Sequence, residues 1–202
     1  MLKPGVTIYF VRHGQTPWNA ASLAQGRSDI ALNDLGRAQA RGNAERLAAL
    51  LRQSGVGTNP GLLDFVSSPL VRARETMEIL RLGIGLPAPG YRVEERLKEM
   101  GFGVMEGASW PDYARGLVEA ERDRGVDPWA YAAEGGESYA DLSARALPAF
   151  REAARDTVVA CHGGVSRCLQ VAMLGVKPAD AITMLIPQDK IMVLRGNEVS
   201  WA

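Results

Sequence analysis

The sequence has few histidines and cysteines, no long apolar run and no excess of charge of either sign. Its 202 residues include two histidines and two cysteines. Lysine plus arginine and aspartate plus glutamate each total 23, so the chain has no overall attraction for nucleic acid or for an anionic membrane. No apolar stretch is long enough to span a bilayer. We therefore expect no nucleic-acid partner and no membrane association, and any anion-binding site has to be a local arrangement.

The cysteine content also bears on the cellular compartment. Cys161 and Cys168 both lie in the last quarter of the chain, and nothing else in the sequence indicates a disulfide framework. The first residues lack the apolar core and small-residue cleavage site of a signal peptide. Free thiols are typical of reducing compartments, so we expect a cytoplasmic protein.

Apolar residues make up 47% of the chain, which is enough for the core of a single domain covering residues 1–202. Segments typical of strands alternate with segments typical of helices, and the strand-like segments are apolar without alternation, as in sheets buried on both faces. We predict an α/β fold, a three-layer αβα sandwich around a mostly parallel, mixed sheet. The predicted strands cover residues 7–11, 62–67, part of 91–98 and 157–161, and the predicted helices cover residues 35–52, 68–82, 138–156 and 165–174.

Two of these helices have recognisable start signals. Ser68 followed by Pro69 is the pattern of an N-cap and a first helical residue. Ser138 with Asp141 three residues later has the pattern of a capping box. Pro148 lies inside the second helix and is expected to kink or split it.

The last part of the chain and the segment before residue 135 are less regular. Residues 182–186 and 191–194 are predicted to form a strand hairpin around Pro187 and Asp189. Residues from about 104 to 134 are predicted to form a short helical excursion over one end of the sheet. This excursion contains aromatic side chains that could either form a small core of their own or line a substrate pocket: Trp110, Tyr113, Trp129 and Tyr131.

Both histidines follow predicted buried strands, and both precede glycine. His13 lies in Arg12-His13-Gly14, and His162 precedes Gly163-Gly164. Ligands of open α/β sheets bind outside the carboxyl ends of the strands, and the free N–H groups at the start of a following helix favour an anion. One such histidine alone would more often be a structural residue, but two of them indicate a shared site. We expect no metal, because Cys161 and His162 are adjacent in a strand and point to opposite sides.

A phosphate group is the anion that the neighbouring residues would suit. Arg12 precedes His13, and Arg72 lies in the first turn of a predicted helix that follows a strand. Planar guanidinium groups match phosphate oxygens, although Arg72 could also lie on a solvated helix face. A leaving oxygen would further need a proton from a carboxylic acid, and Glu99 and Glu106 are both candidates that the sequence does not separate.

The motifs together resemble the histidine phosphatase superfamily, the phosphoglycerate-mutase-like enzymes. Ordered blocks between residues 8 and 167 carry the resemblance, and they are far more specific than an isolated Arg-His-Gly triplet. The blocks are Phe10-Val11-Arg12-His13-Gly14 with Trp18-Asn19, Ser67-Ser68-Pro69 with Arg72, Leu97-Lys98-Glu99 with Phe102-Gly103, Gly135-Gly136-Glu137-Ser138, and Cys161-His162-Gly163-Gly164 with Arg167.

The resemblance implies a phosphomonoester hydrolase that works without a metal or another cofactor and acts on a small phosphorylated substrate. It implies that His13 is the nucleophile and forms a phosphohistidine, that His162 is a second catalytic residue, and that Glu99 protonates the leaving group. It also implies a set of phosphate-binding residues, which comprises Arg12, Asn19, Arg72 and Gly163. A phosphoprotein substrate, the physiological substrate itself and the oligomeric state stay open.

Departures from the family pattern define the alternatives. Gln15 and Gly101 stand where the family often has Glu and Asp, and the excursion is shorter than in the family's mutases. A mutase has to shield its intermediate from water, so the short excursion favours hydrolysis over phosphoglycerate mutase-type transfer. A non-catalytic phospho-ligand-binding module is a further alternative. The spacing between Cys161 and Arg167 also matches the phosphate loop of cysteine-dependent phosphatases, in which Cys161 would be the nucleophile.

Overall fold

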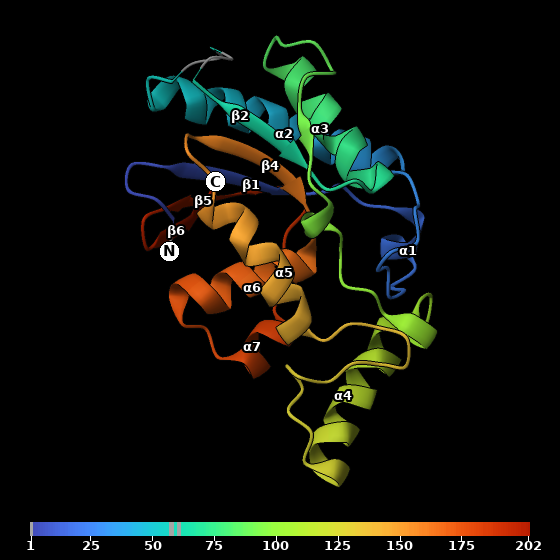
Figure 1. Ribbon diagram of the computed structural model, residues 1–202. Helices are drawn as coiled ribbons and strands as arrows, with labels where there is room; N and C mark the ends of the chain where they lie inside the picture. Colours follow the sequence, from blue (N-terminus) through green and yellow to red (C-terminus); the bar gives the residue numbers. More distant parts are fainter. Residues whose placement is uncertain (1, 57–58, 60–61) are drawn as a thin grey trace.

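The computed structural model describes residues 2–56, 59 and 62–202. In this part of the chain one sheet runs through the centre, with the strand order β3-β2-β4-β1-β5-β6 (Figure 1). The strands are β1 (Thr7–Arg12), β2 (Asp64–Ser67), β3 (Arg92–Val93), β4 (Thr157–Cys161), β5 (Ile191–Arg195) and β6 (Glu198–Trp201). The first four in spatial order are parallel, whereas β5 is antiparallel to β1 and β6 to β5. The prediction of a mostly parallel, mixed sheet is confirmed.

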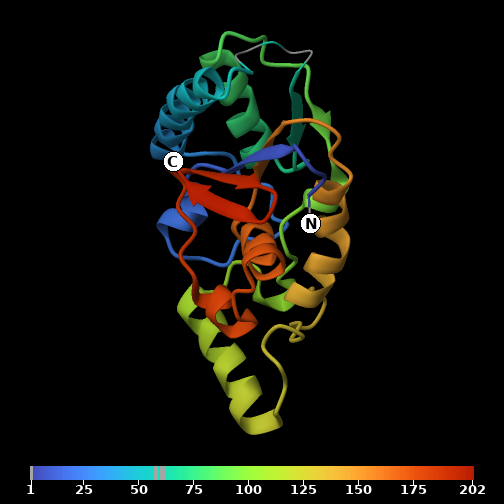
Figure 2. The same cartoon turned by 90° about the vertical axis from the view of Figure 1, so that its left-hand side faces the viewer.

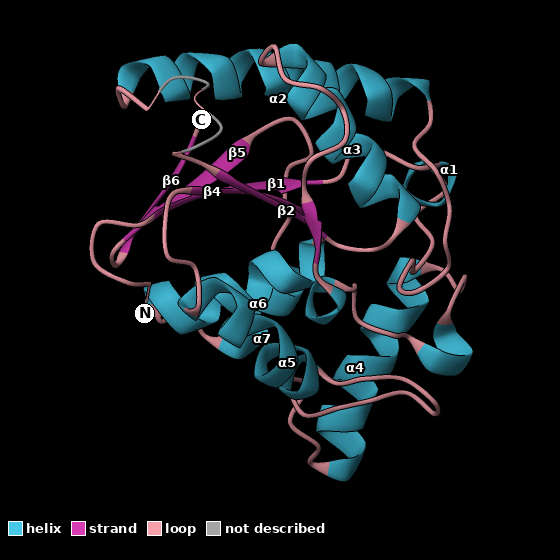
Figure 3. Ribbon diagram, turned by 45° about the horizontal axis from the view of Figure 1, so that its top comes forward, coloured by secondary structure: helices cyan, strands magenta, loops and turns pink. Residues whose placement is uncertain are grey.

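Helices cover both faces of this sheet, which confirms the three-layer sandwich (Figure 3). Helices α2 (Asp34–Gln53) and α3 (Val71–Gly83) lie on one face, and α5 (Tyr139–Arg151) and α6 (Gly163–Leu174) lie on the other. Because successive side chains of a strand point to opposite faces, β1 contributes to two cores. Ile8 and Phe10 pack in the core under α5 and α6, and Tyr9 and Val11 pack in the core under α2 and α3.

The parallel pairing decides where the two histidines meet. Strand β1 pairs with β4 in a register that places Arg12 opposite Cys161. The next residue of each strand is therefore His13 on one side and His162 on the other. Strand β2 pairs with the other edge of β4, so Ser68 leaves the sheet at the same end. Three separate segments thus deliver side chains to one edge of the sheet.

The predicted start of α3 is wrong by two residues. The helix begins at Val71, and its N-cap residue Leu70 makes no side-chain capping bond. Ser68 directly follows β2, and its Oγ atom lies 2.6 Å from Nε2 of His162. The serine side chain is therefore used by the site and not by the helix.

The capping box at the start of α5 is confirmed, since the Ser138 and Asp141 side chains each bond the other residue's backbone N–H. The predicted length of this helix is wrong, because it ends at Arg151 and not near Asp156. Pro148 does not split the helix. It lies in the last turn, and the three residues after it, 149–151, stay helical. Asp156 instead accepts a hydrogen bond from the backbone N–H of Thr7.

The predicted hairpin of residues 182–186 and 191–194 is also wrong. Helix α7 covers Pro178–Thr183, with proline in its first turn and Asp180 near its positive end. The strand over residues 191–194 is confirmed as part of β5, but its hairpin partner is the following strand β6. Gly196 makes that turn with a φ of +58°, a conformation that favours glycine.

The remaining elements lie around the edge of the sheet that carries the histidines. They are α1 (Pro17–Ala20), the short 3-10 helices η1 (Glu95–Leu97) and η2 (Gly103–Met105), and α4 (Trp110–Arg124). Helix α4 projects away from the sandwich, and α7 lies between it and α6 (Figures 1 and 2). None of the described helices combines the length and the apolar character that crossing a membrane requires.

Candidate active site

His13 lies just beyond β1, and its ring is held in one orientation. The side chain is 3% exposed, and Nδ1 lies 2.8 Å from the carbonyl oxygen of Gly14. Because a carbonyl oxygen can only accept a hydrogen bond, Nδ1 carries the ring hydrogen and donates it. Burial lowers the pKa of His13 well below its usual value, and the charges of Arg72 and Arg12 lower it further. The ring is therefore neutral, with its lone pair on Nε2.

Gly14 has to be glycine for this loop to form. A Cβ atom at residue 14 would overlap the backbone of Gly36, in the first turn of α2. The N–H of Gly14 also donates to Oγ1 of Thr76 at 3.3 Å, which ties the loop to α3. Two helices thus fix the backbone that orients the His13 ring.

Arg72 faces the lone pair on Nε2 of His13. Its Nε–H group donates to Nε2 of His13 at 3.2 Å, and the side chain is fully buried. Its other two nitrogens donate to the carbonyl oxygens of Ser28 and Gly26, at 2.9 and 2.7 Å. Burial lowers the pKa of Arg72 to about 10, so the group still carries its charge at neutral pH. The sequence also allowed Arg72 to lie on a solvated helix face. The structure instead buries its side chain against His13.

His162 meets His13 edge to face, with 5.2 Å between the ring centroids. Its Nε2 atom lies 2.6 Å from Oγ of Ser68, whereas its buried Nδ1 atom has no hydrogen-bond partner. Burial lowers the pKa of His162 well below its usual value, with Arg72 as the next cause. A second neutral imidazole therefore offers an unused nitrogen inside the site.

Arg12 brings a second guanidinium to the same place, and its side chain is half-buried. One of its terminal nitrogens donates to the carbonyl oxygen of Ile186, and its buried Nε has no partner. Burial lowers the pKa of Arg12 to about 10, and the neighbouring charge of Arg167 is the next cause. A Cβ atom on Gly163 would lie 3.4 Å from Nε of Arg12 and 3.4 Å from Nη1 of Arg167, so the two guanidinium groups are neighbours.

The structure separates the two glutamates that the sequence left equivalent. Glu99 lines the pocket and is 7% exposed, and its carboxylate accepts from the backbone N–H groups of Gly164 and Met100, at 3.0 and 2.9 Å. Glu106 instead accepts from the backbone N–H groups of Gly26 and Ser28. Glu99 therefore belongs to the site, while Glu106 holds the loop whose carbonyl oxygens bind Arg72.

A partly buried ion pair fixes the segment that carries Glu99. Arg145 on α5 donates to both carboxylate oxygens of Glu137, at 2.8 Å each. The same guanidinium donates to the carbonyl oxygens of Arg96, Lys98 and Glu99. Glu137 also accepts the backbone N–H of Gly101 at 3.1 Å. The backbone on both sides of Glu99 is therefore held from α5.

Three side-chain amides also lie at the site, those of Asn19, Gln25 and Gln188. Asn19, at the third position of α1, accepts from Nε2 of Gln188 at 3.0 Å. The same Gln188 nitrogen donates to the carbonyl oxygen of His13 at 3.1 Å. Gln25 is 8% exposed, and its Nε2 atom is buried without a partner. Gln25 and Gln188 were missed from the sequence, because both lie on irregular loops and carry no spacing signal.

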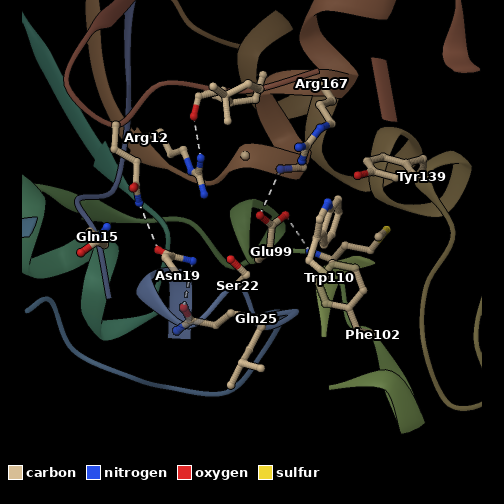
Figure 4. A pocket seen from close by; sticks show the side chains of 17 residues that line it. Arg12, Gln15, Asn19, Ser22, Gln25, Glu99, Phe102, Trp110, Tyr139 and Arg167 are labelled. Carbon is tan, nitrogen blue, oxygen red and sulfur yellow. Dashed lines mark hydrogen bonds between the residues drawn. The ribbon is translucent and has the colours of Figure 1, made fainter. Parts of the chain in front are cut away.

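A pocket of about 270 Å³ opens onto these residues (Figure 4). In the close-up, Arg12 and Arg167 lie across from Asn19, Glu99 and Trp110. His13, Arg72 and His162 are buried and are not among the described residues that line the pocket. The described lining residues are Arg12, Gln15, Asn19, Ser22, Leu23, Gln25, Glu99, Met100, Phe102, Trp110, Tyr139, Gly163, Gly164, Arg167, Leu185, Ile186 and Gln188.

The aromatic residues of the excursion divide between the two roles that the sequence left open. Trp110 lines the pocket, whereas Tyr113 is buried and packs edge to face on Phe102, with 4.9 Å between the ring centroids. Trp129 stacks on Tyr139 at 4.8 Å. The aromatic side chains of the excursion therefore pack on the main core under α5 and α6 and do not form a core of their own, and Trp110 extends this packing into the pocket wall.

The geometry argues against Cys161 as a nucleophile. Its side chain is fully buried in the core under α5 and α6, with Sγ 3.4 Å from the carbonyl oxygen of Leu97. Burial raises the pKa of this thiol well above its usual value, which disfavours the reactive thiolate. Among the described residues, no group of three or more His, Cys, Asp or Glu is placed to hold a metal ion.

Comparison with known proteins agrees with this arrangement. The model of the histidine phosphatase superfamily (branch 1) matches residues 8–202. A glucosyl-3-phosphoglycerate phosphatase from Mycolicibacterium vanbaalenii is 35% identical, over 96% of this chain and 81% of its own length. A protein from Yersinia pestis described as a probable phosphoglycerate mutase is 31% identical, over 86% of this chain and 77% of its own.

Solved structures show the same fold. The structure of a mycobacterial glucosyl-3-phosphoglycerate phosphatase with VO₃ superposes with a TM-score of 0.74 at 30% identity, over 98% of this chain and 96% of that one. A protein from Thermus thermophilus superposes with a TM-score of 0.67 at 28% identity, over 94% of this chain and 92% of that one.

Proposed function

The chain belongs to the histidine phosphatase superfamily and is a phosphatase of that family, and from this premise we propose that His13 is its nucleophile. The observation that carries the proposal is the hydrogen bond from Nδ1 of His13 to the carbonyl oxygen of Gly14. This bond fixes the tautomer in which Nε2 holds the lone pair. Burial keeps the ring neutral by lowering its pKa, so the lone pair is available at neutral pH.

In the first step Nε2 of His13 attacks the phosphorus atom, and the bond from phosphorus to the ester oxygen breaks. Arg12 and Arg72 bind the phosphoryl oxygens, with the Gly163 backbone N–H and the Asn19 side chain as further donors. His162 is proposed to bind a phosphoryl oxygen as well. Nε of Arg12 is a buried donor without an acceptor, and Nδ1 of His162 is a second one when Ser68 donates to Nε2, so both nitrogens support these roles. Ser68 is placed to donate its hydroxyl hydrogen to Nε2 of His162, which leaves the ring hydrogen on Nδ1.

Glu99 protonates the leaving oxygen in the same step. Its position in the pocket, across from Arg12, supports this assignment over Glu106. In the second step the Glu99 carboxylate accepts a proton from a water molecule, and that water attacks the phosphohistidine. The bond between phosphorus and Nε2 breaks, phosphate leaves and the neutral ring is restored.

The substrate is a small phosphorylated compound. A pocket of about 270 Å³ behind a rim of side chains supports a small molecule over a protein surface. Glucosyl-3-phosphoglycerate, named for two mycobacterial relatives, is the first compound to test. Because another relative is described as a probable mutase, the assay with 3-phosphoglycerate should measure both free phosphate and 2-phosphoglycerate.

The excursion over residues 104–134 is proposed to act as the cap of this pocket within a single domain covering residues 1–202. Trp110, at the start of α4, lines the pocket, and its backbone N–H donates to the carbonyl oxygen of Ser22 at 2.8 Å. The cap is thereby tied to the loop that follows α1. A cytoplasmic location is proposed as well, and it is supported by two buried cysteines that are both free thiols.

The test is hydrolysis of p-nitrophenyl phosphate in the presence of EDTA. We expect turnover by the wild type, loss of at least about 10³-fold in His13→Ala, and near-normal turnover in Cys161→Ala. Arg115→Gln is a matched control, because Arg115 lies on the exposed face of α4 and pairs with Asp112. An active His13→Ala protein would overturn the proposal, and loss of turnover in EDTA would refute metal independence.

A further inference from the structure

Gln188 lines the pocket, and the chemistry proposed above gives it no role. It lies in the irregular segment between α7 and β5, and its side chain is half-buried. Its backbone carbonyl oxygen accepts a hydrogen bond from Nδ2 of Asn43 at 2.9 Å, and Asn43 is a fully buried residue of α2. The backbone at Gln188 is therefore anchored to α2 by a contact that does not involve the Gln188 side chain.

Two acceptors determine which way the Gln188 amide faces. Its Nε2 atom lies 3.1 Å from the carbonyl oxygen of His13 and 3.0 Å from Oδ1 of Asn19. Because a backbone carbonyl oxygen can only accept a hydrogen bond, the atom that faces His13 has to be the amide nitrogen. The two hydrogens of this nitrogen match the two acceptors, so Nε2 of Gln188 has no further hydrogen to donate.

The same contacts determine which way the Asn19 amide faces. Its Oδ1 atom accepts from Gln188 and also from the backbone N–H of Thr16, at 3.3 Å. Because both neighbours are donors, the oxygen of Asn19 faces them and the nitrogen lies on the other side of the amide, towards the pocket (Figure 4). One hydrogen of Nδ2 reaches Oε1 of Gln25 over a long distance of 3.5 Å, and the second hydrogen is available to a ligand.

The direction of the Asn19 amide matters because phosphoryl oxygens are acceptors. With Nδ2 towards the pocket, Asn19 is a donor to a phosphoryl oxygen, whereas the reversed amide would present an oxygen to another oxygen. The bond from Gln188 is shorter than the bond from Thr16, so Gln188 provides the stronger of the two contacts that disfavour the reversed amide.

We propose that Gln188 is a positioning residue, which orients the Asn19 amide so that its nitrogen faces the phosphoryl group. Gln188 acts through Asn19, since both of its own donor hydrogens are already used. The inference rests on the proposed function, in which Asn19 donates to a phosphoryl oxygen.

A double-mutant cycle tests whether Gln188 acts through Asn19. The dissociation constant of inorganic phosphate would be measured by calorimetry for the wild type, Asn19→Ala, Gln188→Met and the double variant. Methionine keeps the length of glutamine without its donors. Gln53→Met is the matched control, because Gln53 is exposed at the end of α2 and does not line the pocket. Gln188→Asn, with an amide that is one methylene shorter, takes the place of Gln188→Met in the cycle if that protein does not fold.

We expect Asn19→Ala to weaken phosphate binding by about 10-fold or more and Gln188→Met to weaken it by about 3- to 10-fold. The double variant should bind phosphate as weakly as Asn19→Ala and no more weakly, because Gln188 has nothing to orient once the Asn19 amide is gone. Gln53→Met should bind phosphate as the wild type does. An unchanged affinity in Gln188→Met, or an equal loss with and without Asn19, would overturn the inference.

Hydrolysis of p-nitrophenyl phosphate by the same proteins separates this inference from the proposed function. Coupled losses of phosphate affinity in a wild type that hydrolyses no ester would refute the phosphatase function and leave the orienting role of Gln188 standing. Turnover by the wild type together with independent losses of phosphate affinity would refute the orienting role alone. A wild type that binds no phosphate would also overturn that role, because Asn19 would have no phosphoryl oxygen to bind.

Discussion

The Nε–H group of Arg72 points at Nε2 of His13 from 3.2 Å, and both side chains are buried. A cation beside a nitrogen disfavours its protonation, so the arrangement keeps the histidine in its nucleophilic form. The same guanidinium is placed to bind a phosphoryl oxygen once the nitrogen attacks. In the proposed mechanism, Arg72 therefore keeps the attacking nitrogen of His13 unprotonated and then stabilises the phosphohistidine.

The two buried histidines make stability depend on pH. Their pKa values are lowered in the folded state, so below the usual value of 6.5 the unfolded chain binds protons that the folded chain does not. The free energy of unfolding should be highest above pH 6.5. Below that pH it should fall by about 1.4 kcal/mol per pH unit for each histidine. Urea unfolding between pH 7.5 and 5 measures this slope.

The control for that slope is His13→Asn, which removes one of the two groups and should halve the pH dependence. Nitrogen NMR of labelled histidine gives an independent readout, because the chain has two histidines and the spectrum is simple. Both rings should stay neutral at pH 6.5, with the hydrogen of His13 on Nδ1. Titration of His13 near pH 6.5 would contradict the burial that the structure shows.

Glu99→Gln should slow the hydrolysis of alkyl phosphates much more than that of p-nitrophenyl phosphate. An alkoxide needs a proton to leave, whereas p-nitrophenolate is stable without one. We expect kcat on glycerol 3-phosphate to fall by about 10²- to 10⁴-fold, with a much smaller loss on the activated ester.

Glu106→Gln is the matched comparison for Glu99→Gln. Because Glu106 accepts backbone N–H groups of Gly26 and Ser28, its loss should lower the free energy of unfolding by about 1–3 kcal/mol. It should change kcat by the same factor on glycerol 3-phosphate and on p-nitrophenyl phosphate. If Glu106→Gln, and not Glu99→Gln, produced the dependence on the leaving group, the assignment of the proton donor would be wrong.

Arg145→Met should remove the support of the Glu99 segment. The side chains of Arg145 and Glu137 are 22% and 18% exposed, so removing Arg145 leaves the poorly solvated Glu137 with a single ion-pair partner, Arg27, which is 53% exposed. We expect a loss of about 3 kcal/mol in the free energy of unfolding and a larger drop in kcat on alkyl phosphates than on p-nitrophenyl phosphate.

The double variant Glu137→Met with Arg145→Met distinguishes the loss of stability in Arg145→Met from its loss of activity on alkyl phosphates. It should recover part of the stability, because the charge of Glu137 is gone and Arg27, which also loses this partner, is 53% exposed and solvated, while the leaving-group dependence persists. Recovery of both stability and alkyl phosphatase activity would show that the pair is a stabilising contact with no part in positioning Glu99.

Gly164→Ala should disturb the proton donor without changing any polar side chain. A Cβ atom at residue 164 would overlap Oε1 of Glu99 and come within 3.0 Å of Leu142. We expect kcat on glycerol 3-phosphate to fall by more than about 10-fold. Gly116→Ala is the control, since nothing lies within 4 Å of its added Cβ and alanine favours the α4 helix by about 1 kcal/mol. Full alkyl phosphatase activity in Gly164→Ala would contradict the contact.

The sequence predicted the parts of the fold that depend on unbroken patterns. The buried runs of β1 and β4 and the capping box at Ser138 have local signals, and each was found where it was expected. The meeting of His13 and His162 followed from a general property of parallel sheets, since both residues come directly after strands. The two histidines also meet only if β1 and β4 are neighbours in the sheet, and in the structure these two strands pair directly.

Other parts depend on contacts that the sequence does not encode locally. The apolar residues between 182 and 186 fit a short strand as well as a helix, but helix α7 ends at Thr183 and residues 184–186 belong to neither a helix nor a strand. Ser68 had the pattern of an N-cap, but its hydroxyl bonds His162 from a distant segment. Gln25, Gln188 and the choice between Glu99 and Glu106 became visible only once loops far apart in the chain were placed together.

Trapping the phosphorylated enzyme tests the central claim most directly. The wild type would be mixed with p-nitrophenyl phosphate, quenched in alkali within milliseconds and digested for mass spectrometry. The account predicts an acid-labile phosphoryl group on the peptide that contains His13, and its absence from His13→Ala. A phosphoryl group on Cys161, on another residue, or on no residue during steady turnover would contradict a phosphohistidine at His13.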